Sequence, residues 1–383
     1  MKRILILGST GSIGRQTVSV LENLGLNAVG LSANSDVDRL EEQIRALKPT
    51  FAVMTDEAAA EALKQRVQDT ETVVFAGTDG LVKMIREAEF DVAVNGIVGM
   101  AGTLPFLEVI RKGKDIAVAN KESLVTAGNI IKAEAKKHGA RILPVDSEHS
   151  AVFQCLQAAP PRRRLNKILL TCSGGPFFGQ TKEQLAAVTP EMALRHPSWK
   201  MGAKITVDCA TMMNKGLEIM EAVRLFDLPE DRVEVLIHRE SIIHSLVEFE
   251  DHSVLAQLGL PDMRIAIQYA LTYPDRLPSP VGGLDLTTVS SLHFHQPDTC
   301  VFPATELCRQ AIREDGIYPT VVNAANEVAV NAFLNKRISF PAIVDVVRRQ
   351  MEQTVQVSNP DLETIFETDR QVRANTETFI STL

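Results

Sequence analysis

Short apolar runs alternate with amphipathic stretches along the first 145 residues of the chain. Continuous apolar runs are typical of strands buried on both faces, and the stretches between them have the 3.6-residue periodicity of helices. We expect strands at 3–7, 27–31, 51–54, 72–75, 91–95, 115–119 and 140–145, with helices between most of them, for example at 15–24 and 57–68. This alternation predicts an α/β fold with a doubly wound, parallel, Rossmann-like sheet.

The pattern changes after about residue 165. Further strands are expected at 167–172, 204–208, 233–238, 245–250 and 253–258, the last two joined by a tight turn. The intervening stretch 173–203 is rich in glycine and proline and carries the single tryptophan, as lid loops often do. Residues 303–383 are helical in pattern throughout. We therefore predict four parts: a Rossmann-like domain at 1–145, a central α+β domain at 146–278 with a lid loop, a linker at 279–302, and a C-terminal helical bundle domain at 303–383.

Composition narrows the class of protein. The chain has 383 residues, 45% of them hydrophobic, and a net charge of −8. It is too long for one ordinary core, and its acidity argues against nucleic-acid binding, which needs a basic face. No apolar run approaches the length of a membrane span. Five cysteines without a close CxxC pair indicate neither a zinc site nor a disulfide framework, and reduced thiols fit a cytoplasmic protein.

Three glycines, Gly8, Gly11 and Gly14, separate the first predicted strand from the first helix. Glycine is needed where backbone turns tightly and approaches a pyrophosphate, and a helix N-terminus supplies amide donors. The spacing is GxxGxxG, and a plain strand–turn–helix is the alternative. The position on the first turn of a doubly wound sheet favours dinucleotide binding.

The end of the second strand bears on which dinucleotide is bound. An acid at that point would hydrogen-bond the ribose 2′-hydroxyl of NAD. Here Asn34 and Ser35 come first, which leaves room for a 2′-phosphate and favours NADP. Asp36 lies slightly beyond and would repel a phosphate, and the nearest cation is Arg39.

Polar residues follow another strand of the same sheet. Asn120, Lys121 and Glu122 should lie at the carboxyl edge, where such sheets bind ligands. Asn120 could equally cap the next helix, with Glu122 suiting its positive end. The two roles are compatible.

An acidic block follows the last strand of the sheet. Asp146 and Glu148 flank Ser147, which would cap a helix at 148–157. A site for Mg²⁺ or Mn²⁺ would need a third oxygen ligand. Glu218 could supply it from a helix that also carries Asn214 and Lys215, although a surface Lys–Glu pair explains that spacing as well.

Eight motifs occur along the chain in the order GSTGSIG, ANKESLV, PVDSEH, SGGPF, RHPSWKMG, ATMMNKGLE, VLAQLGLPDMR and NAANEVAV. Together they resemble those of the 1-deoxy-D-xylulose 5-phosphate reductoisomerase family over essentially the whole chain. The resemblance implies metal-dependent rearrangement and NADPH-dependent reduction of a phosphosugar, 1-deoxy-D-xylulose 5-phosphate, to 2-C-methyl-D-erythritol 4-phosphate in the non-mevalonate isoprenoid pathway. It also implies a homodimer. Residues 1–145 would bind NADP, and residues 146–278 would form the catalytic domain.

The resemblance also implies roles for residues at matching positions. The metal, Mg²⁺ or Mn²⁺, would be held by Asp146, Glu148 and Glu218. Catalysis would involve Lys121, Glu148, His196 and Glu218. Substrate would contact Lys121, Ser147, Glu148, Ser173, His196, Cys209, Asn214, Lys215 and Glu218. Cofactor would contact Thr10, Gly11, Ser12, Ile13, Asn120, Glu122 and Gly202, in addition to Asn34 and Ser35, which the strand tip itself indicates. Trp199 would belong to the closing loop.

Two positions depart from the family pattern. Cys209 stands where the family usually has serine, and a thiol is a poorer hydrogen-bond donor than a hydroxyl. The tip at Ser35 and Asp36 lacks the basic or amide residues often seen there. Two other functions remain open at this point: a semialdehyde dehydrogenase with Cys209 as nucleophile and His196 as base, and a regulator that only binds the dinucleotide.

Overall fold

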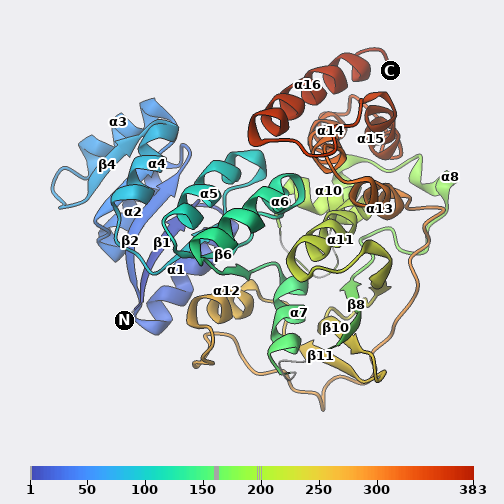
Figure 1. The fold of residues 1–383 in the computed structure, drawn as a ribbon, viewed down its shortest axis with the longest axis horizontal. Helices are drawn as coiled ribbons and strands as arrows, with labels where there is room; N and C mark the ends of the chain where they lie inside the picture. The colour runs from blue at the N-terminus through green and yellow to red at the C-terminus, as the bar shows by residue number, and fades with distance from the viewer. Residues whose placement is uncertain (1, 159–163, 196, 198, 200) are drawn as a thin grey trace. The chain divides into compact units, whose positions relative to one another are not determined.

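The computed structural model describes residues 2–158, 164–195, 197, 199 and 201–383. The chain divides into two compact units, each built from three segments (Figure 1). Unit 1 comprises Met1–Ser123, Ile131–Ser150 and Asp262–Gly283, and unit 2 comprises Leu124–Ile130, Ala151–Pro261 and Leu284–Leu383.

Unit 1 contains the predicted Rossmann-like sheet. Its strands are β1 (Arg3–Leu7), β2 (Asn27–Ala33), β3 (Phe51–Met54), β4 (Val73–Ala76), β5 (Val92–Asn95), β6 (Asp115–Val118) and β7 (Ile142–Pro144). They pair in parallel in the order β4-β3-β2-β1-β5-β6-β7. Because the chain proceeds in one direction from β1 to β4 and in the other from β5 to β7, the order reverses beside β1. Ligands bind at such a switch point, at the carboxyl ends of the strands.

Helices connect these strands, as the periodicity predicted. They are α1 (Ser12–Leu24), α2 (Val37–Leu47), α3 (Glu57–Arg66), α4 (Gly77–Glu87), α5 (Thr103–Arg111) with the 3₁₀ turn η1 (Gly99–Gly102), and α6 (Lys121–His138). Side-chain caps fix where several of them begin: Asp36 accepts the Arg39 N–H at 3.2 Å, and Asp56 accepts the Ala59 N–H at 2.8 Å. Helix α6 passes through both units and is kinked at Ala127.

Residues 262–283 belong to unit 1, although the sequence analysis assigned most of them to the central domain. Helix α12 (Met263–Thr272) packs against α1, and the Lys2 ammonium donates to the carbonyls of Leu271 and Tyr273 at 3.0 and 3.1 Å. These contacts hold the end of α12 beside the first strand. The boundaries of the functional domains stay a prediction.

Unit 2 contains a second, four-stranded sheet in the order β11-β10-β8-β9. Strands β8 (Leu165–Cys172) and β9 (Val233–Ile237) are parallel, whereas β10 (Ile243–Phe249) runs antiparallel to β8 and to β11 (Val254–Leu258). The remaining helices are α7 (Ser147–Gln157), which begins in unit 1, α8 (Lys182–Leu185), α9 (Pro190–Ala193), α10 (Ala203–Thr211), α11 (Met213–Phe226), α13 (Ala304–Glu314), α14 (Tyr318–Leu334), α15 (Ala342–Gln353) and α16 (Leu362–Ile380), with the 3₁₀ turn η2 (Glu230–Arg232). The predicted helical C-terminal region is confirmed.

The strand predicted at 204–208 is wrong, because these residues lie in α10. Their β-branched side chains favour a strand locally, but packing decides. The helix places Val207 and Ala210 in the core while Lys204 reaches Asp208 one turn later at 2.9 Å. Asp208 also accepts the Asn326 amide of α14 at 2.8 Å, which ties α10 to the helical region.

In the described part of the chain, no helix is both long and apolar enough to cross a membrane.

Candidate active site

The glycine-rich loop lies at the switch point of unit 1, between β1 and α1. The Gly8 N–H donates to the Ser32 hydroxyl at 3.0 Å and the Ser9 N–H to the Ser32 carbonyl at 2.7 Å, which ties the loop to β2. Gly8 has a φ of +83°, which favours glycine. A Cβ atom on Gly14 would lie 2.3 Å from the Gly8 carbonyl oxygen, so only glycine lets α1 start so close to the loop.

The N-terminus of α1 is suited to an anion. Its cap is Gly11, which offers no side-chain acceptor, and its first turn contains no acid. Gly11 and Ser12 are exposed. The first amide N–H groups of a helix lack partners within it and carry a partial positive charge. The predicted cofactor loop therefore has the local structure that a pyrophosphate needs.

The tip of β2 carries the residues predicted to lie near a 2′-phosphate. Asn34 and Ser35 are both exposed, and the Asn34 side-chain oxygen accepts the Thr55 hydroxyl at 2.8 Å. The Asp36 carboxylate caps α2 and lies 3.5 Å from the Arg39 guanidinium. Its charge is thus partly balanced, which weakens the objection that Asp36 would repel a phosphate.

The predicted cap at Asn120 is confirmed: its side-chain oxygen accepts the Ser123 N–H at 2.9 Å. Its amide nitrogen donates to the carbonyls of Ile97 at 2.5 Å and Gly99 at 2.9 Å, so Asn120 fixes the loop after β5 to the start of α6. Lys121 and Glu122 follow at once and are buried.

Lys121 pairs with the acidic block of the same unit. Its ammonium lies 2.6 Å from the Asp146 carboxylate, and the His149 ring nitrogen lies 3.7 Å from the same oxygen. Burial pushes the pKa of Asp146 up, but the positive charge of Lys121 and the hydrogen bond from His149 outweigh it, so the pKa falls well below its usual range. Asp146 is therefore held as a carboxylate.

The expected cap at Ser147 needs correction. Ser147 is the first residue of α7, and the Asp146 carbonyl accepts the Ser150 N–H at 2.8 Å, so Asp146 occupies the capping position. The Ser147 hydroxyl instead donates to the Glu148 carboxylate at 2.5 Å. Sequence reasoning also passed over His149, which is fully buried. Its spacing, three residues after Asp146 on a helix, is the signal that could have found it.

In unit 2, α11 brings together Asn214, Lys215 and Glu218. The Lys215 ammonium and the Asn214 amide both donate to the Glu218 carboxylate, and Lys215 also donates to the Thr171 carbonyl at 2.6 Å. Lys215 and Glu218 are 2% and 1% exposed, so the surface-pair interpretation is wrong. A buried charge pair of this kind is costly unless its members are hydrogen-bonded, as these are.

The Ser173 turn follows β8 in the same unit. Ser173 is buried, and its hydroxyl accepts the Gly175 N–H at 3.2 Å. A Cβ atom on Gly175 would lie 2.7 Å from the Cys209 carbonyl oxygen, so the turn lies against the last turn of α10. Since Lys215 reaches Thr171 at the end of β8, four of the residues expected to bind substrate lie on neighbouring elements of unit 2: Ser173, Cys209, Asn214 and Lys215.

The predicted lid is only partly described. His196 lies outside the described residues. Residues 173–195 contain the short helices α8 and α9, each capped by a threonine. The Trp199 ring lies 6.4 Å from the His244 ring, and the exposed Gly202 precedes α10 as its cap. Closure of this segment stays a prediction.

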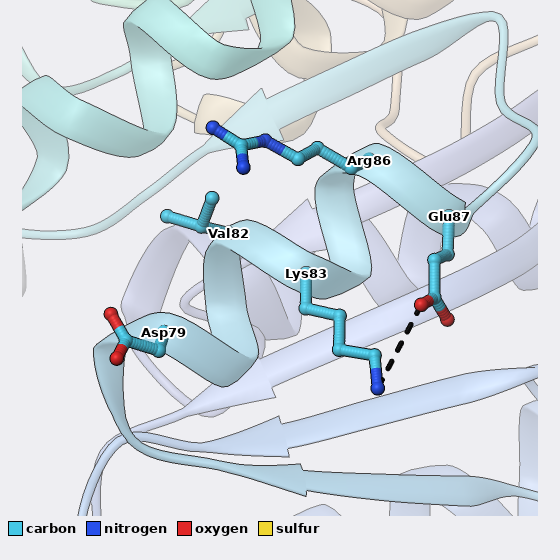
Figure 2. A pocket seen from close by; sticks show the side chains of 5 residues that line it. All are labelled: Asp79, Val82, Lys83, Arg86 and Glu87. Atoms are coloured by element: carbon cyan, nitrogen blue, oxygen red, sulfur yellow. Dashed lines mark ion pairs between the residues drawn. The ribbon is translucent and has the colours of Figure 1, made fainter.

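Figure 2 shows a surface hollow over α4, lined by Asp79, Val82, Lys83, Arg86 and Glu87. Two of its charges are paired: Lys83 lies 3.8 Å from Glu87, and Arg86 lies 2.8 Å from Glu108. The hollow is an ordinary charged helix face, and nothing in it resembles the sites above.

Comparisons with known proteins show which family the chain resembles. Residues 4–128 match the family described as 1-deoxy-D-xylulose 5-phosphate reductoisomerase, and residues 142–226 and 258–375 match its two C-terminal domain families. A reductoisomerase of that name from Desulfitobacterium hafniense is 48% identical over 382 residues, covering 99% of this chain and 100% of the relative. One from a Geobacillus species is 50% identical over 378 residues, covering 97% and 98%.

Solved structures show the same similarity. The Zymomonas mobilis reductoisomerase in complex with NADPH has a TM-score of 0.93 at 39% identity and covers 100% of both chains. A DOX-P reductoisomerase in complex with NADPH, fosmidomycin and magnesium has a TM-score of 0.94 at 37% identity, covering 100% of this chain and 98% of that one.

Proposed function

The chain belongs to the 1-deoxy-D-xylulose 5-phosphate reductoisomerase family, and from this premise we propose which of its residues carry the reaction. It is an NADPH-dependent oxidoreductase that uses a divalent cation, and it converts the phosphosugar 1-deoxy-D-xylulose 5-phosphate to 2-C-methyl-D-erythritol 4-phosphate in isoprenoid biosynthesis. The residue roles below are our proposal.

The cofactor would bind at the switch point of unit 1. The uncapped start of α1 supports a pyrophosphate contact by Thr10, Gly11, Ser12 and Ile13. Asn34 and Ser35 would lie beside the 2′-phosphate, and Asn120, Glu122 and Gly202 would contact the rest of the cofactor. NADPH supplies hydride to the substrate, while the protein fixes its orientation.

The cation would be held by Asp146, Glu148 and Glu218. Carboxylate oxygens are the ligands that Mg²⁺ and Mn²⁺ prefer. Two of these acids are paired with lysines: Asp146 with Lys121, and the buried Glu218 with Lys215. Held by these carboxylates, a cation would supply Lewis-acid polarisation of the substrate oxygens. Lys121, Ser147 and His196 would surround the reacting carbons.

The substrate phosphate would lie in unit 2, between the Ser173 turn, Cys209 and the start of α11. The observation that carries this proposal is the buried group formed by Asn214, Lys215 and Glu218, joined to the end of β8 through the Thr171 carbonyl. One element then presents a cation and an amide for a phosphate next to a carboxylate for a metal. Binding the phosphate away from the reacting carbons helps to position them.

The test is NADPH oxidation with 1-deoxy-D-xylulose 5-phosphate, followed by the loss of NADPH absorbance. Activity should disappear with EDTA and return with Mg²⁺ or Mn²⁺. Activity that survives full chelation would refute the metal assignment. A semialdehyde dehydrogenase acting through Cys209 would instead be indifferent to chelation and inactivated by thiol alkylation.

We also propose that the protein is a cytoplasmic homodimer. None of the five cysteines is in a disulfide, which fits a reducing compartment. Strand β11 lies at the edge of its sheet and exposes Val254, Leu255 and Leu258, which suits pairing with a second copy. Light scattering of the wild type and of Leu255→Lys tests this proposal: a monomeric wild type would contradict it.

A further inference from the structure

The Ser173 turn comprises residues 173–175. Each of the three successive carbonyls of Thr171, Cys172 and Ser173 accepts a hydrogen bond. The Thr171 carbonyl accepts a hydrogen bond from the Lys215 ammonium at 2.6 Å, and the Cys172 carbonyl accepts one from the backbone N–H of His238 at 2.7 Å. The Ser173 carbonyl accepts the Arg239 guanidinium at 3.3 Å. The same guanidinium nitrogen lies 3.5 Å from the Gly175 carbonyl.

Arg239 reaches this position because of the sheet. Strands β8 and β9 are parallel and end together, with Cys172 opposite Ile237. The residues just after β9 therefore lie beside the turn just after β8. The Arg239 guanidinium lies 5.2 Å from the Phe178 ring, a distance typical of a cation–π contact. This contact holds the side chain along the turn, although Arg239 as a whole is exposed.

The orientation of these carbonyls decides where the amides point. In a trans peptide the carbonyl of one residue and the N–H of the next point in opposite directions. Because the Ser173 carbonyl faces Arg239, the Gly174 N–H faces the other way. Gly174 and Gly175 have φ values of +75° and +68°, a conformation that a side chain would disfavour. The Gly174 amide hydrogen and the Ser173 carbonyl oxygen thus lie on opposite sides of the turn.

We propose that Arg239 is a positioning residue for the substrate phosphate: by holding the Ser173 and Gly175 carbonyls, it directs the Gly174 amide and the Ser173 hydroxyl toward that phosphate. The inference rests on the proposed phosphate site at Ser173. Without Arg239, the Ser173 carbonyl would be free to turn toward the substrate phosphate dianion, and its partial negative charge would repel that dianion. The guanidinium also adds a positive charge behind the turn.

The test compares Arg239→Met, which keeps a long side chain against Phe178 but removes every donor, with Arg239→Lys, which keeps the charge. Arg164→Met is the matched control, because Arg164 lies in the same unit and its side chain is 78% exposed in a pair with Glu250. For each enzyme, kcat, the KM values for both substrates, the inhibition constant of inorganic phosphate and the melting temperature are measured.

Arg239→Met should raise the KM for the phosphosugar and the inhibition constant of inorganic phosphate in parallel, by about 3- to 10-fold, as expected for one hydrogen bond of modest strength. The KM for NADPH, kcat and the melting temperature should change little. Arg239→Lys should fall between Arg239→Met and the wild type, and Arg164→Met should match the wild type.

Unchanged KM and inhibition constants in Arg239→Met would overturn the inference. So would a fall in melting temperature that raises the KM for both substrates together, because that pattern indicates general damage. A wild-type enzyme that fails to turn over the phosphosugar would refute the proposed function instead. Calorimetry with inorganic phosphate would still test Arg239 in that case.

Discussion

In the cofactor loop, Gly14 is the position with the least room for a side chain. A Cβ atom there would lie 2.3 Å from the Gly8 carbonyl oxygen and 2.4 Å from the Ser9 Cα, and both are backbone atoms that no side-chain rotation can move away. The loop cannot move away, because Gly8 itself is tightly packed: a Cβ atom added there would lie 3.0 Å from the Gly96 backbone. Gly14→Ala must therefore displace the loop or the start of α1.

The expected size of the effect follows from two opposing contributions. Inserting a methyl group into a tightly packed site costs about 1–3 kcal/mol. Alanine in a helix returns about 0.5–1 kcal/mol relative to glycine, so the net loss of unfolding free energy should be at most about 2.5 kcal/mol. NADPH binding should suffer more: losing one amide hydrogen bond to a charged phosphate costs about 1.5–3 kcal/mol, or roughly 10- to 150-fold in Kd.

The assay is a fluorescence titration with NADPH, together with urea unfolding of the enzyme without cofactor. Ser19→Ala, in the same helix, is the control, because it changes helix propensity without a backbone clash and should leave the Kd unchanged. A Gly14→Ala enzyme with wild-type Kd and wild-type stability would show that the close approach of α1 to the loop is not needed for cofactor binding.

Three further predictions concern the residues that the resemblance brought forward. Glu218→Gln should abolish turnover and weaken Mn²⁺ binding, because it removes a charged ligand; an unchanged Mn²⁺ titration would contradict the ligand assignment. Cys209→Ser should keep or improve the KM for the phosphosugar, since a hydroxyl is the better donor, whereas complete inactivation would restore the nucleophile hypothesis. NADPH should give a higher kcat/KM than NADH, because no acid ends β2 and Asp36 is engaged by Arg39; the opposite ratio would refute this.

The parts of the fold that depend on neighbouring residues could be predicted from the sequence. The parallel strands follow from continuous apolar runs, and the cap at Asn120 follows from the residue type just before a helix. The glycine loop could be predicted for the same reason, because a tight turn depends on the types of a few consecutive residues.

The strand predicted at 204–208 failed because a distant contact decides the structure there. Residues 204–208 have the composition of a strand, but Asp208 bonds Asn326 of a helix that follows more than a hundred positions later, and α10 forms instead. No local pattern reports a partner as far along the chain as Asn326. The cap assigned to Ser147 failed for a local reason: the Ser147 hydroxyl donates to the neighbouring Glu148.

The lysine–acid pairs also show what the sequence could not predict, because their burial depends on the whole fold. A carboxylate buried alone takes up a proton, and a protonated acid binds a divalent cation poorly. In unit 1 Lys121 lies 2.6 Å from Asp146 and lowers the pKa of that partly buried carboxyl. In unit 2 Lys215 donates to the buried Glu218. A lysine three residues before a glutamate is common on exposed helices, where it contributes little. Here both members of the pair are buried, and burial is what the spacing could not reveal.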